Sequence, residues 1–187
     1  YMDVHEVTVG QFREFVDQSG YKYGGSWDEV AEYSPTDDHP MIHVNWHDAM
    51  AYCEWAGKRL PTQAEWEKAA RGGLQGKRYP WGDEVDDTKA NYDGNVGKTT
   101  VTGSYTANGY GLYDVAGNVW EWCADWYGSH TNSPTITLPG PDTGSYRVLR
   151  GGGWGHSTSD LRVAHCYGTS PDGRYSFLGF RCVSGLN

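Results

Sequence analysis

Basic residues are scarce in this chain, and they form no run. There are 15 Lys and Arg against 24 Asp and Glu, which gives a net charge of −9. Nucleic acids and anionic membrane surfaces are bound by clustered Lys and Arg, so we expect neither as a partner. Long apolar runs are missing too. None approaches the roughly 20 residues of a membrane-spanning helix, and we therefore expect no membrane insertion.

Closely spaced cysteine pairs are also absent. The four cysteines, Cys53, Cys123, Cys166 and Cys182, form no Cys-x-x-Cys motif, so the common signatures of a zinc site or a dithiol redox centre are missing. His156 and His165 lie near Cys166 in the sequence, but scattered ligands of this kind more often bind no metal. A nucleophile and base drawn from the same segment would lack a fixed acid partner, so no catalytic residue is assigned.

Glycine and large aromatic residues are abundant instead. The 187 residues include 26 Gly, 14 Tyr and 9 Trp, but only 4 Phe. Tyr and Trp bring polar groups into a core, where they bond to the backbone of irregular segments. The composition therefore favours a loop-rich fold. The length suits one domain, 1–187, since no linker or repeat divides the chain.

Helix signals are confined to the first part of the chain. We expect a helix over 8–20, capped by Thr8, a second from Asn45 or Asp48 to Gly57, and a third over 62–71, opened by a capping box. Residues 21–38 are expected to form a loop. Beyond Gly73 the pattern indicates short antiparallel strands and long loops. Two or three helices before such a sheet predict an α+β fold.

Several motifs in the chain are those of a known family. Residues 108–122 read NGYGLYDVAGNVWEW, residues 57–67 read GKRLPTQAEWE, and residues 79–82 and 179–182 read YPWG and GFRC. Together they resemble the formylglycine-generating enzymes, also called sulfatase-modifying factors. The resemblance covers nearly the whole chain. It implies the irregular C-type-lectin-like α+β fold of that family.

The resemblance also carries expectations about cysteines. Cys53 and Cys182 match a disulfide pair of the family, which would imply an oxidising compartment and an extracellular, cell-surface or virion-surface location. Two buried apolar thiols are the simpler alternative. The family's catalytic cysteine pair falls on His156 and Leu161 in this chain. We therefore expect neither copper nor the usual oxidase activity.

A calcium site is implied by the same resemblance. The family's calcium-binding turn aligns with the carboxylates of Asp114 and Glu121 and the carbonyls of Gly117 and Val119. Ca²⁺ prefers several hard oxygen ligands of these types. An acidic turn without a metal is the alternative.

The segment after Gly153 has an unusual composition. Residues 155–178 contain no Lys, Glu, Gln, Met or Trp. The 11 of them that lie between positions fitting the family's frame can all be reached from the asparagine codon AAC by changing only its adenines. This resembles the variable region of proteins diversified by retroelements, some of which use a similar scaffold. The expected ligand-binding residues of this region, 153–178, are Trp154, His156, Ser157, His165, Cys166, Tyr167, Gly168, Asp172, Gly173, Tyr175, Ser176 and Phe177.

Two main functions remain open from the sequence, beside that of a structural subunit in a larger surface assembly. The first is a non-catalytic receptor or adhesin whose variable surface binds a protein or glycan on a cell surface, since Tyr, His, Ser, Gly and Asp are typical of binding loops. The alternative is an enzyme, or an enzyme-maturation factor, that acts without the usual cysteine pair. An ordinary family member with a polar groove would show a similar composition.

Overall fold

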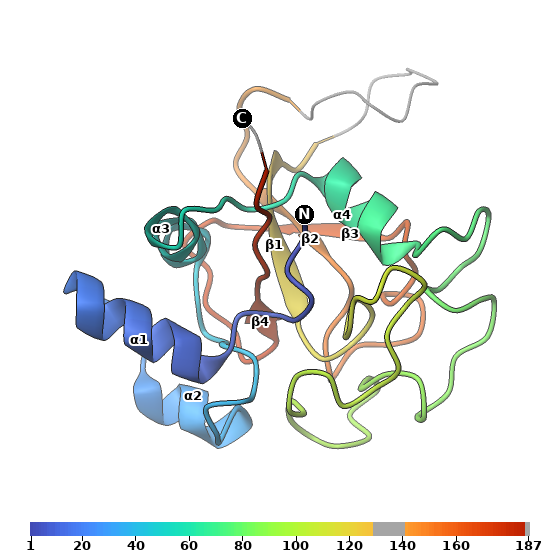
Figure 1. The fold of residues 1–187 in the computed structure, drawn as a ribbon, viewed down its shortest axis with the longest axis horizontal. Coiled ribbons are helices and arrows are strands. Elements are labelled where there is room, and N and C mark those ends of the chain that lie inside the picture. Colours follow the sequence, from blue (N-terminus) through green and yellow to red (C-terminus); the bar gives the residue numbers. More distant parts are fainter. Residues whose placement is uncertain (129–140, 186–187) are drawn as a thin grey trace.

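The computed structural model describes residues 1–128 and 141–185 of the chain. Four helices come first, followed by four strands and long irregular segments (Figure 1). The helices are α1 (Val9–Ser19), α2 (Trp27–Tyr33), α3 (Trp46–Trp55) and α4 (Gln63–Ala70). The strands are β1 (Trp120–Trp126), β2 (Arg147–Arg150), β3 (Cys166–Thr169) and β4 (Leu178–Gly179). The predicted α+β class is confirmed.

Local hydrogen bonds define the three predicted helices. Thr8, Asn45 and Thr62 each accept a hydrogen bond from the backbone N–H three residues later. The side chain of that later residue accepts a bond from the backbone N–H of the capping residue in return, which completes a capping box. These reciprocal bonds satisfy N–H groups that have no partner inside the helix. Gly20 ends α1 in the left-handed conformation, with φ of 71°, which glycine adopts without steric cost.

Helix α2 corrects the prediction of a loop over 21–38. It has only 7 residues, and Val30 is its one fully buried residue, so no apolar stripe marks it in the sequence. Ser26 caps it by accepting from the backbone N–H of Glu29. The Trp27 ring packs near Phe12 of α1. Tertiary packing therefore stabilises this helix, and the fold has four helices among the described residues rather than two or three.

The sheet has the strand order β3-β2-β1-β4. Its first two pairings are antiparallel, but β4 runs parallel to β1, with Trp120 opposite Leu178. The expectation of antiparallel strands alone is therefore wrong. A parallel pairing needs a long connection between its strands, and the chain here passes through β2 and β3 before it returns.

Both faces of the sheet are covered. Trp122 and Leu149 belong to the larger core, which includes residues of α1 and α3. Their neighbours Cys123 and Val148 belong to a second core with Trp66 of α4. This division follows from the alternation of side chains along a strand.

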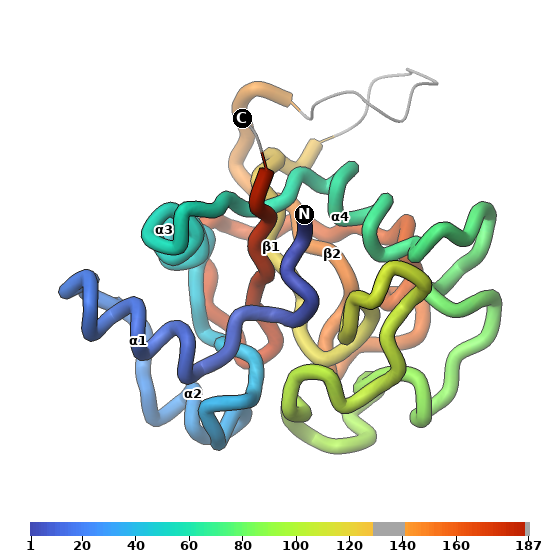
Figure 2. The backbone as a smooth tube through the Cα atoms, in the orientation of Figure 1, coloured from blue at the N-terminus to red at the C-terminus, as the bar shows by residue number. Residues whose placement is uncertain are grey.

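The two ends of the described chain lie side by side (Figure 2). The Asp3 amide donates to the Cys182 carbonyl, and Met2 forms a bridge with Val183. A disulfide joins Cys53 of α3 to Cys182, which confirms the pair implied by the resemblance. Among the described residues, no helix is both long and apolar enough to cross a bilayer.

Candidate functional site

Trp120, the first residue of β1, lies beneath a group of rings from the predicted binding region. Its ring centroid is 5.7 Å from that of His156, 5.9 Å from His165 and 6.1 Å from Tyr167. The two histidines belong to the segment between β2 and β3, and Tyr167 is on β3. Trp120 is almost fully buried, whereas Tyr167 is 56 % exposed. The indole thus supports rings that reach solvent.

The same group of rings continues toward β4. The His156 and Phe177 centroids are 4.7 Å apart, and Phe177 stacks on Tyr175 at 5.3 Å with an angle of 2° between the rings. Tyr175 is 43 % exposed. We call this set the aromatic surface: Trp120, His156, His165, Tyr167, Tyr175 and Phe177. The structure thus brings together five of the residues that the sequence indicates, and it adds Trp120.

Backbone carbonyls attach the loop 170–177 to the rest of the molecule. The amides of Trp46, His43 and Trp120 donate to the carbonyls of Pro171, Tyr175 and Phe177. The indole N–H of Trp154 donates to the carbonyl of Ser176. These bonds hold the backbone in place without using the side chains of the predicted binding positions.

Trp154 and its neighbours are fixed in a similar way. The Trp154 ring stacks on Tyr33, with 5.4 Å between the centroids. Its amide donates to the Asn118 carbonyl, and its own carbonyl accepts from Gly94. The His156 carbonyl accepts from the Asp93 amide. Trp154 therefore acts as a support for the loop.

Other predicted binding residues lie apart from the aromatic surface. Cys166 precedes Tyr167 on β3, so its side chain takes the opposite face of the strand, and Gly168 has no side chain to present. A Cβ on Gly168 would lie only 2.3 Å from the Tyr127 ring, and Gly173 lies under the Tyr175 ring in a similar manner. Asp172 is exposed, at 3.7 Å from His47.

Asp160 connects Ser157 to His165. The Ser157 hydroxyl donates to the Asp160 carboxylate at 2.8 Å, and His165 Nε2 lies 3.4 Å from the same group. In a catalytic triad the histidine stands between the serine and the acid, whereas here the acid stands in the middle. Nothing in this arrangement activates the serine as a nucleophile.

Burial lowers the pKa of both surface histidines. Desolvation is the main cause for His156 and for His165, and the nearby Asp160 carboxylate opposes it at both sites. Both imidazoles are therefore neutral at pH 7. Within the part of the chain that the structure describes, no three His, Cys, Asp or Glu residues gather as a metal would require.

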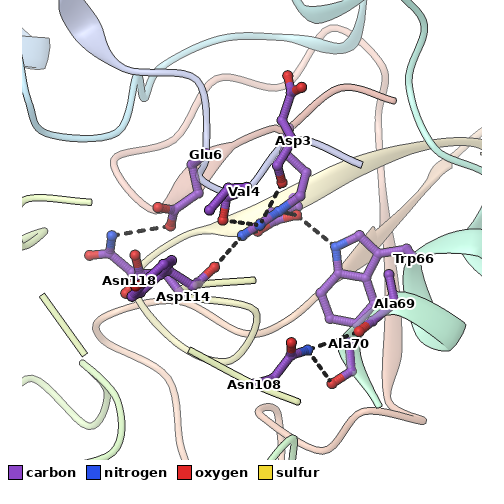
Figure 3. A network of polar contacts seen from close by, with 12 residues as sticks. Asp3, Val4, Glu6, Trp66, Ala69, Ala70, Asn108, Asp114 and Asn118 are labelled. Atoms are coloured by element: carbon purple, nitrogen blue, oxygen red, sulfur yellow. Dashed lines mark hydrogen bonds and ion pairs between the residues drawn. The ribbon is translucent and has the colours of Figure 1, made fainter. Parts of the chain in front are cut away.

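Asp114 and Glu121, the two acids expected to bind calcium, are buried, and Glu121 bonds to Trp66 of α4. Figure 3 shows Asp114 and Trp66 in the surrounding polar network. Both oxygens of Glu121 accept bonds from the Arg181 guanidinium, and one also accepts from the Trp66 indole at 2.6 Å. A carboxylate paired in this way does not fit a calcium ligand, because the positive charge of the guanidinium would repel the cation.

Asp114 has a different environment in the same network. One of its oxygens accepts from the Gly103 amide at 2.6 Å, while the other is buried without a partner among the described residues. Burial raises the pKa of this carboxyl to about 6. The Gly117 amide donates to the Gly151 carbonyl, which fixes the turn. Of the two carboxylates expected to bind calcium, Asp114 thus retains an open oxygen, and Glu6 Oε2 nearby also has no partner among the described residues.

Residues 1–186 match the family described as "Sulfatase-modifying factor enzyme 1-like domain". The chain belongs to this family. It is 46 % identical over 167 residues to the formylglycine-generating enzyme of Streptomyces coelicolor, over 79 % of this chain and 53 % of that protein. It is 40 % identical over 206 residues to the serine/threonine-protein kinase pkn1 of Chlamydia pneumoniae, over 100 % of this chain and 33 % of that protein.

A solved structure of similar fold is Treponema denticola variable protein 1. Its TM-score to this chain is 0.78 at 30 % identity, and the alignment covers 95 % of this chain and 81 % of that one. The predicted resemblance to formylglycine-generating enzymes and to variable proteins is thus confirmed. The chain spans about a third to a half of the curated relatives named above.

In this member of the family, the two positions expected for catalytic cysteines are not thiols. His156 takes part in the aromatic surface, and Leu161 is fully buried. Trp120 is a supporting residue that sequence reasoning did not assign to the site. The feature of the sequence that could have indicated Trp120 is its position at the start of a strand that enters the core.

Proposed function

We propose that this chain is a non-catalytic ligand-binding domain that displays exchangeable side chains on a fixed backbone. The observation that carries the proposal is the attachment of loop 170–177 through the carbonyls of Pro171, Tyr175, Ser176 and Phe177. Bonds to main-chain oxygens persist when the side chain changes. The surface can therefore vary while the scaffold keeps its structure.

The chemistry of the aromatic surface favours a macromolecular ligand. Two surface hollows formed by described residues lie elsewhere, one lined by Lys58 and Arg59 and the other by Arg13 and Trp27. Exposed rings among small polar residues are typical of paratopes, which bind broad surfaces. The ligand we propose is a protein or glycan on a cell surface. The disulfide is consistent with an extracellular, cell-surface or virion-surface location.

Similarity to Treponema denticola variable protein 1 supports retroelement diversification. An enzymatic role is the second candidate, because the chain is 46 % identical to a formylglycine-generating enzyme. His156 and Leu161 cannot supply the two thiolates of the usual mechanism. A template repeat in the flanking gene, differing only at adenines, would favour diversification.

Two displayed libraries test the proposal. One randomises His156, His165, Tyr167, Asp172, Tyr175, Ser176 and Phe177, and the other randomises buried positions of the same region, Leu161, Val163 and Leu178. We expect most members of the first library to remain folded and to yield binders to immobilised streptavidin as a model target. The second library should lose folding. Equal loss of folding in both libraries would contradict the proposal.

A further inference from the structure

The side chain of Arg174 bonds to the scaffold at the start of α3. Its guanidinium pairs with the Asp48 carboxylate through both terminal nitrogens, and one of them also donates to the His43 carbonyl at 3.2 Å. The guanidinium carbon lies 5.3 Å from the centroid of the Tyr23 ring. Arg174 thus connects its own loop, 170–177, to α3 and to the segment that precedes α3.

Asp48 joins these elements at the start of α3. Its carboxylate closes the capping box by accepting from the Asn45 amide at 2.9 Å. It also accepts from the Tyr21 hydroxyl at 2.9 Å. The side chain is only 1 % exposed, and a buried carboxylate requires a well-placed cation. Arg174 supplies that cation from the middle of the predicted binding loop.

Arg162 offers a matched contrast in the same region. Its side chain is exposed, and its Nε donates to the nearby Ser159 carbonyl at 2.9 Å. This bond stays within one short turn, so it does not connect the loop to a helix. The two arginines therefore have the same chemistry but different structural consequences.

We infer that Arg174 is a positioning residue that fixes the backbone of loop 170–177 on α3 and so orients Asp172, Tyr175 and Phe177. The contribution of Arg174 to ligand binding rests on the proposed function, whereas its anchoring of the loop does not. Within the predicted binding region this position is consequently not exchangeable, although its neighbours are. A planar guanidinium that bonds a carboxylate and a carbonyl at once cannot be replaced by an amide.

Hydrogen exchange of the full chain tests the anchor without any ligand. The amides of His43, Trp46 and Trp120 donate to carbonyls of the loop, so their exchange rates report its opening. We expect Arg174→Gln to accelerate their exchange by at least about tenfold, equivalent to about 1.4 kcal/mol, while Arg162→Gln leaves it unchanged. The double variant Asp48→Asn with Arg174→Gln removes both charges but keeps a side-chain oxygen for the cap of α3. If the single variant folds poorly, this double variant should give the same acceleration.

Binding provides the second readout. Streptavidin binders selected from variation at Asp172, Tyr175, Ser176 and Phe177 should weaken at least about tenfold with Arg174→Gln, but keep their affinity with Arg162→Gln. Unchanged local exchange in both anchor variants, or exchange that rises equally throughout the chain, would overturn the inference. Local acceleration without any recoverable binder would support the anchor and contradict the proposed function instead.

Discussion

Glu121 and Arg181 form an ion pair that the core encloses completely, since both side chains are at most 1 % exposed. Removing one partner of such a pair leaves an uncompensated buried charge. We expect Glu121→Gln to lower the free energy of unfolding by about 3–5 kcal/mol in urea titrations. Asp83→Asn is the control, because it breaks a half-exposed pair with Lys77 and should cost no more than about 1 kcal/mol.

The same measurement tests the calcium prediction. If Asp114 holds calcium in solution, CaCl₂ should raise the unfolding midpoint of the wild-type chain and EDTA should lower it. The pairing of Glu121 with Arg181 is then expected to rearrange. A midpoint that is indifferent to both additions would contradict the calcium prediction, and the acidic turn would be a purely structural feature.

The two histidines of the aromatic surface predict a dependence on pH. Burial lowers the folded-state pKa of His156 and His165 below the ordinary value of 6.5, so the unfolded chain binds more protons as the pH falls. Their contribution to stability is present above pH 6.5 and is lost as the pH falls through the lowered values. We expect the variant His156→Asn with His165→Asn to show a flatter decline between pH 7 and 5 in thermal unfolding. An unchanged slope would mean that the loss of stability between pH 7 and 5 arises from His5, His39 or His43, whose pKa values are also lowered.

At the scale of elements, local signals and tertiary packing explain what the sequence could predict. Helices α1, α3 and α4 are encoded by capping bonds between residues three apart, so they can be found from sequence alone. Helix α2 lacks an apolar stripe, and the parallel pairing of β4 depends on which distant segments the cores bring together. The parallel pairing has no local signature, and for α2 the sequence offers only the Ser26 cap with Glu29 three residues later.

The candidate site divides in the same way. The composition of residues 155–178 indicates a binding region, and several of its aromatic residues do lie together. The alternation of β3 turns Cys166 away from Tyr167, which requires the strand to be known first. The role of Arg174 depends on Asp48, which is far from it in sequence. Composition thus locates the region, and pairing decides which of its residues can act together.

At the scale of the whole molecule, the disulfide joins α3 to the last described segment across 129 residues. Closing so long a loop restricts the unfolded chain, which stabilises the fold by about 4–5 kcal/mol in the chain-entropy model. We expect the variant Cys53→Ala with Cys182→Ala to lose that amount in urea unfolding under oxidising conditions. In the presence of dithiothreitol, the difference from wild type should shrink to the smaller cost of lost packing.

Cys123→Ala is the matched control for this experiment, because Cys123 is a free and fully buried thiol. Its substitution should cost the same under both redox conditions, since only packing changes. The ends of the described chain lie together beside the disulfide, so its loss should also speed hydrogen exchange at Asp3, whose amide bonds to Cys182. If the double variant lost equal stability with and without reductant, the two cysteines would act as packed thiols, and the cross-link would not be what holds α3 to the C-terminal segment.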